Sequence, residues 1–185
     1  MKNTPTAIMV DVESSDNIAT SGILSIGAVA LDRDKIYDMQ FYIPIKFESC
    51  LDYSCTFSGD TLDWWRKQSP EAQKVWLDPK GVDLVTGLNA FKNWVFKVCD
   101  GNTNNVKLFG NGAAFDNAIM EVLFRKTDIK SPFKFWNNSC YRTIKSAHPK
   151  VKMERSGLYH HALDDAISQA EHLIQINKQA GGIYL

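Results

Sequence analysis

Apolar and β-branched residues form three short runs in the first quarter of the chain. The runs occupy residues 7–12, 23–31 and 36–43, and polar residues separate them. Their length and composition are typical of buried strands. Pro44 ends the third run, because proline has no N–H to donate to a neighbouring strand. Three successive strands predict an antiparallel meander.

The rest of the chain alternates between helical periodicity and short apolar runs. Apolar residues at helical spacing and local start signals predict the helices. These cover residues 61–68, a short segment from Ser69, 81–98, 113–125, a short segment ending at Ala147, and 161–179. A short apolar run at 106–109 predicts a further strand, and the segment 136–141 is expected to form the last one. The pattern predicts one mixed α/β domain over residues 1–185. Its central sheet is a mixed, five-stranded one, in which parallel strands follow the antiparallel meander, and helices flank it.

Composition and charge restrict the kind of partner. The chain has 185 residues, enough for one hydrophobic core, and 21 basic residues balance 21 acidic ones. Proteins that coat long nucleic acids are usually basic, so the zero net charge argues against that class. A short contact with one end of a nucleic-acid strand, in which metal ions supply the positive charge, is compatible with the zero net charge.

No targeting or membrane segment stands out in the sequence. The start lacks a secretory signal pattern, and no apolar run approaches the roughly 20 residues of a membrane helix. We therefore expect a cytoplasmic protein without a membrane partner, in the host cytoplasm if a phage encodes it. Four cysteines without CxxC spacing predict reduced thiols rather than disulfides or zinc. The oligomeric state stays open, with a homodimer among the options.

Two acids, Asp11 and Glu13, follow the first apolar run. Residues two apart on a strand share one face, so both carboxylates leave the same side of the sheet. Taken alone, the Asp-x-Glu triplet is more simply explained as a strand ending in solvated acids. The apolar run directly before it instead places the acids at the edge of a buried sheet.

A third acid, Asp116, lies at the predicted junction between a strand and a helix. The segment 109–116 contains Gly110 and Gly112, but Phe115 stands where a dinucleotide-binding loop has its third glycine. One interpretation places Asp116 in the first helical turn, facing Asp11 and Glu13. The other is an acid favoured there by the helix dipole alone.

Two histidines and two acids lie around the start of the last predicted helix, namely His160, His161, Asp164 and Asp165. The small residues of this helix mark its buried stripe, and Asp165 lies beside that stripe. Asp164 projects more readily toward solvent. His160 stands just before the helix, where it can reach a bound water, although His161 is a rival on geometry alone.

Together these segments predict four carboxylates and a histidine at one edge of the sheet. Clustered carboxylates repel each other, and a fold that gathers them needs a compensating cation. Hard divalent cations such as Mg²⁺ or Mn²⁺ prefer oxygen ligands. The pattern therefore predicts a metal-dependent reaction on a phosphate ester.

The three motifs resemble those of the DEDDh exonuclease superfamily, in order and in spacing. They are Asp-x-Glu near the start, Asn-Gly-x-x-Phe-Asp in the middle and His-x4-Asp near the end. Segments 61–68, 110–119 and 135–143 are similar to small phage-type exonucleases related to exodeoxyribonuclease A (DexA) and to the Rv2179c-like group. The resemblance covers nearly the whole chain and implies a ribonuclease H-like fold.

The resemblance also implies a reaction and roles for individual residues. Asp11, Glu13, Asp116 and Asp165 would bind two Mg²⁺ or Mn²⁺ ions, and His160 would be the general base. The activity implied is 3′-to-5′ exonuclease action on single-stranded DNA or RNA, releasing nucleoside 5′-monophosphates. Similarity to a deoxyribonuclease favours DNA, with RNA maturation or decay as the alternative.

Four residues are predicted to contact the terminal nucleotide, namely Ser14, Asn111, Phe115 and Trp64. Aromatic side chains stack on any base, but tryptophans at helical positions more often belong to the core. Many relatives carry a bulky apolar residue where this chain has Ser15. In those relatives the apolar side chain is expected to pack against the last base of the strand. Whether this chain has such a contact is left open by Ser15.

Two other functions fit parts of the pattern. One is a nucleic-acid-binding module that keeps the fold without turnover, which the complete ligand set argues against. The other is an endonuclease of the ribonuclease H type, which the His-x4-Asp ending disfavours.

Overall fold

The computed structural model describes residues 4–185, and its centre is a five-stranded sheet in the order β3-β2-β1-β4-β5. The strands are β1 (Ala7–Ser14), β2 (Ile23–Leu31), β3 (Phe41–Pro44), β4 (Lys107–Gly110) and β5 (Asn138–Cys140). The first three pair antiparallel, whereas β4 runs parallel to β1 and β5 parallel to β4. The predicted meander followed by parallel strands is confirmed.

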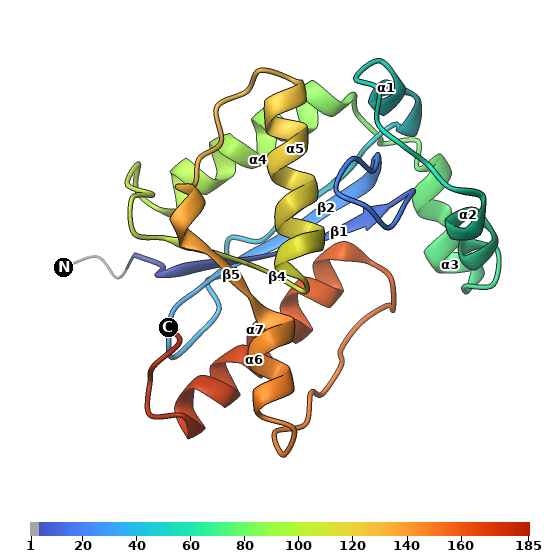
Figure 1. The fold of residues 1–185 in the computed structure, drawn as a ribbon. Coiled ribbons are helices and arrows are strands. Elements are labelled where there is room, and N and C mark those ends of the chain that lie inside the picture. The colour runs from blue at the N-terminus through green and yellow to red at the C-terminus, as the bar shows by residue number, and fades with distance from the viewer. Residues whose placement is uncertain (1–3) are drawn as a thin grey trace.

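Helices cover both faces of the sheet (Figure 1). Helices α4 (Leu84–Val98) and α5 (Ala118–Lys126) lie on one face, and α6 (Tyr141–Ala147) and α7 (Ala162–Gln179) lie on the other. Three short helices, α1 (Phe47–Leu51), α2 (Gly59–Trp65) and α3 (Pro70–Gln73), lie at one end of the sheet. Figure 1 shows the start of α7 close to that same end.

Alternation along β1 divides its side chains between two hydrophobic clusters. Ile8, Val10 and Val12 pack with residues of α4 and α5. Ala7 and Met9 pack with residues of α7. Because strand side chains alternate, positions 11 and 13 share the α7 face with positions 7 and 9. The strand therefore presents its two acids toward the helix that carries Asp165.

The third strand differs from its prediction at both ends. Ile36 makes one bridge to Leu31, but regular pairing resumes only at Phe41, which lies opposite Ala28. Between these two pairs, four residues (37–40) on one segment thus face two residues (29–30) on the other, and the extra residues bulge out of the ladder. Pro44 lies inside β3 rather than after it, on the outer strand of the sheet, where proline is tolerated.

Several helix boundaries also differ from the prediction. Helix α4 begins at Leu84 because the Asp83 side chain caps it by accepting from Thr86 N. Helix α2 begins and ends earlier than predicted, with Ser58 as its N-cap. The predicted helix over 113–125 starts as a π-helical turn, Ala113–Asn117, before α5. Helix α1 was not predicted.

Helix α7 crosses β2 at Gly27 with almost no space between the two backbones. A Cβ placed on Gly27 would lie 2.1 Å from the carbonyl carbon of Ala162 and 2.2 Å from Leu163 N. Gly27 is the register partner of Asp11 on the neighbouring strand. The missing side chain thus lets the first turn of α7 lie directly over the acids of β1.

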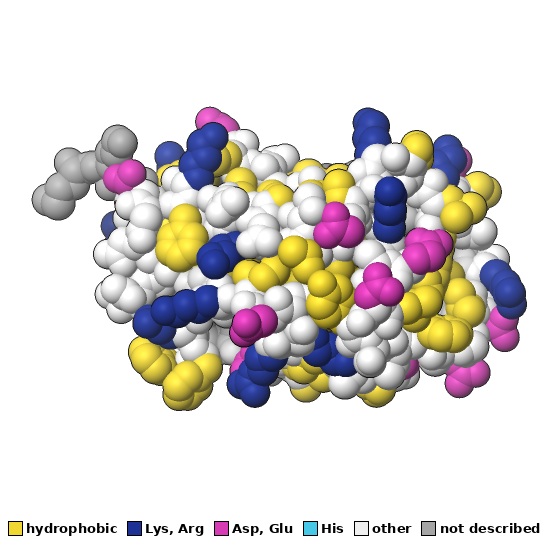
Figure 2. Space-filling view, turned by 90° about the horizontal axis from the view of Figure 1, so that it is seen from above, with side chains coloured by type: hydrophobic (Ala, Val, Ile, Leu, Met, Phe, Trp, Pro, Cys, Tyr) yellow, Lys and Arg dark blue, Asp and Glu magenta, His cyan; other side chains and the backbone are white. Residues whose placement is uncertain are grey.

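Figure 2 shows the face that α4 and α5 cover, where basic and acidic side chains are interspersed. On this face, the distribution of charge agrees with the balanced composition and does not resemble a surface that coats nucleic acid. Within residues 4–185, no helix combines the length and apolar character needed to cross a membrane.

Candidate functional site

A cavity of about 480 Å³ lies where β1, the turn before α5 and the start of α7 meet. All of the site residues predicted from the sequence line it. These are Asp11, Glu13, Ser14, Trp64, Asn111, Phe115, Asp116, His160 and Asp165. Segments more than 150 residues apart in the chain are therefore brought together at one edge of the sheet.

Asp11 and Glu13 leave the same face of β1 and are 9% and 7% exposed. Gln169, on the second turn of α7, donates from Nε2 to Asp11 Oδ1 at 2.7 Å. The other side-chain atom of Gln169, Oε1, is buried without a hydrogen-bond donor among the described residues. Helix α7 thus orients one acid of β1 through a direct hydrogen bond.

Asp116 lies in the π-helical turn and is 1% exposed. Its Oδ1 accepts from the backbone N–H of Val12 at 3.3 Å, while Oδ2 is buried without a donor among residues 4–185. A Cβ on Gly110 would lie 2.7 Å from Asp116 Cβ, so the glycine permits this close approach. Asp116 therefore faces β1, as predicted, and π-helical turns of this kind are frequent at functional sites.

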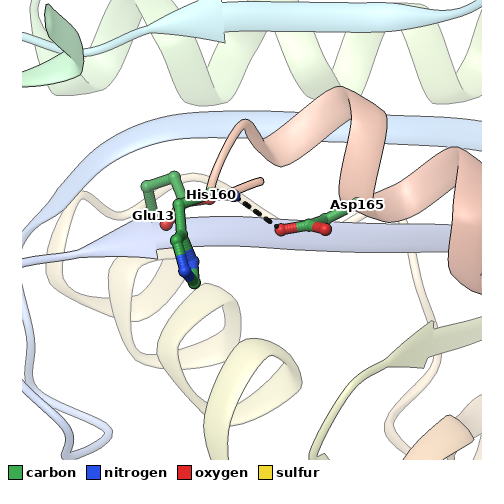
Figure 3. A group of neighbouring side chains, drawn as sticks. All are labelled: Glu13, His160 and Asp165. Atoms are coloured by element: carbon green, nitrogen blue, oxygen red, sulfur yellow. Dashed lines mark hydrogen bonds between the residues drawn. The ribbon is translucent and has the colours of Figure 1, made fainter. Parts of the chain in front are cut away.

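Asp165 and His160 lie at the start of α7 (Figure 3). The backbone N–H of His160 donates to Asp165 Oδ2 at 3.2 Å, and the Arg155 guanidinium forms an ion pair with Asp165 Oδ1. His160 has φ = 60°, a left-handed conformation that is uncommon for a residue with a side chain. Such a conformation is often found where function fixes the backbone.

The two adjacent histidines face different surroundings. The His160 ring lies in the cavity, 4.8 Å from the Trp64 ring and 6.2 Å from the Trp65 ring between centroids. The His161 ring packs on Tyr42 at 4.4 Å, and its Nδ1 lies 3.2 Å from Asp164 Oδ2. The geometry therefore separates the two candidates and favours His160.

Burial makes three of the carboxylates hard to ionise, and the charges of neighbouring acids add to this effect at Asp11 and Glu13. Burial and the charges of Asp116, Glu13 and Asp165 hold the pKa of Asp11 well above its usual value. Burial, followed by the charges of Asp165 and Asp116, raises the pKa of Glu13 to about 8. Burial raises the pKa of Asp116 to about 6, against hydrogen bonds that lower it.

These properties fit a site for divalent cations. The donors are hard carboxylate oxygens, they repel one another, and Asp116 Oδ2 has no donor in the described protein. Ligand atoms of Glu13, His160 and Asp165 all lie within 4.8 Å of one another. A bound cation would remove the repulsion that otherwise raises the carboxylate pKa values.

The stability of the metal-free protein should fall as the pH rises from about 4.5 to about 8. Glu13 has an ordinary pKa of 4.5 and a folded-state pKa of about 8, so within this range the folded state holds a proton that the unfolded state releases. Differential scanning calorimetry with a chelator should show this fall, and Mg²⁺ or Mn²⁺ should reverse it at pH 8.

The variant Glu13→Gln provides the control for this pH dependence, because it removes the titrating group and leaves the side-chain volume. Its midpoint of unfolding should change less between pH 4.5 and 8 than that of the parent protein. An equal pH dependence in both proteins would show that Glu13 is not the group responsible.

The predicted nucleotide contacts differ in how available they are. Trp64 is 43% exposed at the cavity, whereas Trp65 is 2% exposed and donates from Nε1 to the Ser14 carbonyl at 2.9 Å. The Ser14 hydroxyl donates to the Asp16 carbonyl at 2.9 Å and keeps its lone pairs for a ligand. Ser15 is fully buried, and its hydroxyl donates to backbone carbonyls of Gly22 and Thr56, so its side chain does not line the cavity.

Several polar residues of the cavity were missed by the sequence analysis, among them Gln169, Arg142 and Arg155. Gln169 follows Asp165 by four positions on α7, and that helical spacing could have indicated it. The two arginines stand outside the three motifs, and nothing in their local sequence marks them. Their place depends on how α6 and the loop before α7 fold.

Comparisons with known proteins show the family and the fold of this chain. The family model described as the 3′-5′ exoribonuclease Rv2179c-like domain matches residues 6–177. No curated protein sequence matches significantly. The nuclease domain of 3′hExo, a DEDDh family member bound to rAMP, has a similar structure with a TM-score of 0.66 and 15% identity, over 95% of this chain and 93% of that one.

Two further solved structures have a similar fold. Pop2p of S. pombe, in its Mg²⁺- and Mn²⁺-bound form, has a TM-score of 0.64 and 13% identity, over 96% of this chain and 85% of that one. Exonuclease X, in complex with 5′ overhanging duplex DNA, has a TM-score of 0.59 and 15% identity, over 95% of this chain and 93% of that one. The sheet order and helix layers described above therefore confirm the predicted ribonuclease H-like fold. With the family model matching most of its length, the chain belongs to the Rv2179c-like 3′-5′ exoribonuclease domain family and is a 3′-5′ exonuclease of the DEDDh type.

Proposed function

We propose that this enzyme removes nucleotides one at a time from the 3′ end of single-stranded nucleic acid and releases nucleoside 5′-monophosphates. The observation that carries the proposal is the convergence of four buried carboxylates beside His160 in one cavity. Asp11, Glu13, Asp116 and Asp165 would hold two Mg²⁺ or Mn²⁺ ions. Such ions activate water and stabilise a leaving oxygen when bound next to a phosphodiester.

His160 is proposed to take the proton of the attacking water. Burial lowers the pKa of His160, although the charge of Asp165 opposes this shift. The neutral imidazole, which can accept a proton, is thereby favoured near neutral pH. Two contacts hold His160 in place. Its ring packs edge-on against Trp64, and its backbone N–H donates a hydrogen bond to Asp165.

The terminal nucleotide is proposed to bind between the acids and the aromatic side chains of the cavity. Trp64 offers a half-exposed ring to the cavity. Phe115 and Asn111, both from the middle motif, line the same cavity. Base stacking on aromatic rings is tolerant of sequence, which suits an enzyme that degrades a strand progressively. The Ser14 hydroxyl is placed to accept a hydrogen bond from the terminal sugar.

The nature of the strand is the finer part of the proposal. The family is described as exoribonuclease-like, which supports RNA. The resemblance of segments 61–68, 110–119 and 135–143 to exodeoxyribonuclease A supports DNA. Parallel assays on DNA and RNA strands of one sequence measure the preference directly.

The function is tested with 5′-labelled single strands and Mg²⁺ or Mn²⁺. A ladder that shortens from the 3′ end, with 5′-monophosphates as products, is the expected result. A circular single strand should stay intact. Cutting of the circle would indicate an endonuclease, and the absence of any shortening with either cation would refute the proposal.

Substitution of the two histidines should separate their roles. His160→Ala is expected to lower kcat by about 10² to 10⁴, because the proton acceptor is lost, while strand binding is largely retained. His161→Ala is the matched control, since its ring packs on Tyr42 away from the cavity, and its kcat should change far less. A larger loss with His161→Ala in single-turnover assays would reverse the assignment.

A further inference from the structure

Two arginines line the cavity, and their surroundings differ. Arg155 forms an ion pair with Asp165 and lies over the Tyr159 ring. Arg142 has no carboxylate within 4.0 Å of its guanidinium and no side-chain hydrogen bond among residues 4–185. It is thus a cation in the cavity wall whose donors are not used by the described protein.

The side chain of Arg142 lies beside the loop that carries the middle motif. A Cβ on Gly112 would lie 3.8 Å from both Cζ and Nη2 of Arg142, so the guanidinium lies against the backbone of this loop. Arg142 belongs to the first turn of α6, and its side chain is exposed. Asn111 and Phe115 flank Gly112 and line the same cavity.

The positive charge of Arg142 influences Asp116, although no carboxylate of the described residues forms an ion pair with it. Burial raises the pKa of Asp116, and the charge of Arg142 opposes that shift. A guanidinium carries five N–H donors in a planar arrangement that matches the oxygens of a phosphate. A free guanidinium beside a nucleotide-binding cavity therefore suits an anionic group of the bound strand.

We propose that Arg142 binds the phosphodiester group immediately on the 5′ side of the scissile bond. The scissile phosphate itself belongs among the acids, their cations and His160, whereas Arg142 is bonded to none of these residues. This inference rests on the proposed function, and it makes Arg142 a binding residue that selects strands over single nucleotide esters. Its contact exists only when the substrate continues beyond the penultimate nucleotide.

The test pairs a change in the enzyme with a change in one phosphate. The substrate is a 5′-labelled 12-nucleotide strand, either unmodified or with one neutral methylphosphonate at the linkage immediately 5′ of the first scissile bond. For the parent enzyme, the modification should lower kcat/KM of the first cleavage about 10- to 100-fold, the loss expected for a hydrogen-bonded charge contact. For Arg142→Ala, both strands should be cleaved at the same reduced rate.

The conservative variant and a surface control complete the design. Arg142→Lys should retain part of the sensitivity to the modification, because lysine keeps the charge but not the planar pair of donors. Arg33→Ala removes an arginine that is 74% exposed and lines a different pocket, and it should behave like the parent enzyme.

Each result has a definite meaning. A parent enzyme that is insensitive to the methylphosphonate, or an Arg142→Ala variant that is as sensitive as the parent, would overturn the role of Arg142. A parent enzyme that shortens neither strand would instead refute the proposed function. For Arg142→Ala, we expect kcat/KM to be lower than that of the parent enzyme and equal for the unmodified and the methylphosphonate strand.

Discussion

Replacing Asp116 with asparagine is expected to abolish hydrolysis and, without divalent cations, to stabilise the folded protein. Asparagine keeps an oxygen that can accept from Val12 N–H, as Asp116 Oδ1 does at 3.3 Å. It removes one negative charge from a buried cluster in which burial raises the pKa of Asp116 to about 6. The free energy of unfolding should therefore rise by roughly 2–3 kcal/mol at pH 8.

The opposite signs of the two effects distinguish a catalytic from a structural role. Activity is measured on labelled strands, and stability by urea unfolding with a chelator at pH 8. Hydrolysis should fall at least about 10³-fold, since a carboxylate needed to bind the cations is lost. Asp34→Asn is the control, because Asp34 is 69% exposed and pairs with the exposed side chain of Arg33. Retained hydrolysis, or destabilisation of the metal-free protein, would contradict the account.

Gly27→Ala is expected to destabilise the protein and to displace the start of α7. The added Cβ would lie 2.1 Å from the backbone of Ala162, so the helix must move away from β2. Overpacking of this kind typically costs about 2 to 3 kcal/mol. Because His160 and Asp165 lie at the displaced end of α7, affinity for Mn²⁺ should fall as well.

Gly59→Ala is the matched control for this substitution. A Cβ at Gly59 meets nothing within 4 Å, and the residue opens helix α2. Its unfolding free energy should be unchanged or slightly higher, since alanine has fewer unfolded conformations than glycine. If urea unfolding shows equal stability for Gly27→Ala and the parent, the close packing of α7 on β2 is not what positions the site.

Much of the fold could be predicted because the relevant signals are local. The run 23–31 is predominantly apolar and forms β2 with the same bounds. The period of two along β1 places Asp11 and Glu13 on one face, and the structure shows them together in the cavity. Hydrophobic spacing likewise indicated α7, and with it the position of Asp165.

The remaining features depend on contacts between distant segments. The bulge before β3 arises from its pairing with β2, and the π-helical turn at Asp116 accompanies a hydrogen bond to Val12, more than 100 residues away. Arg142 and Arg155 reach the cavity only through the packing of α6 and the following loop. His160 and His161 are neighbours in sequence, and only the fold turns their rings to different surroundings.

The central claim is that Asp11, Glu13, Asp116 and Asp165 form a cation site. Isothermal titration calorimetry of Mn²⁺ into the metal-free protein tests this claim most directly. The parent protein should bind Mn²⁺ with release of protons at pH 7, because Glu13 has a pKa of about 8 and is largely protonated before the metal binds. Asp11→Asn should weaken this binding strongly, whereas Asp34→Asn should not. Binding of equal strength in Asp11→Asn and the parent, or no binding in either, would contradict the account.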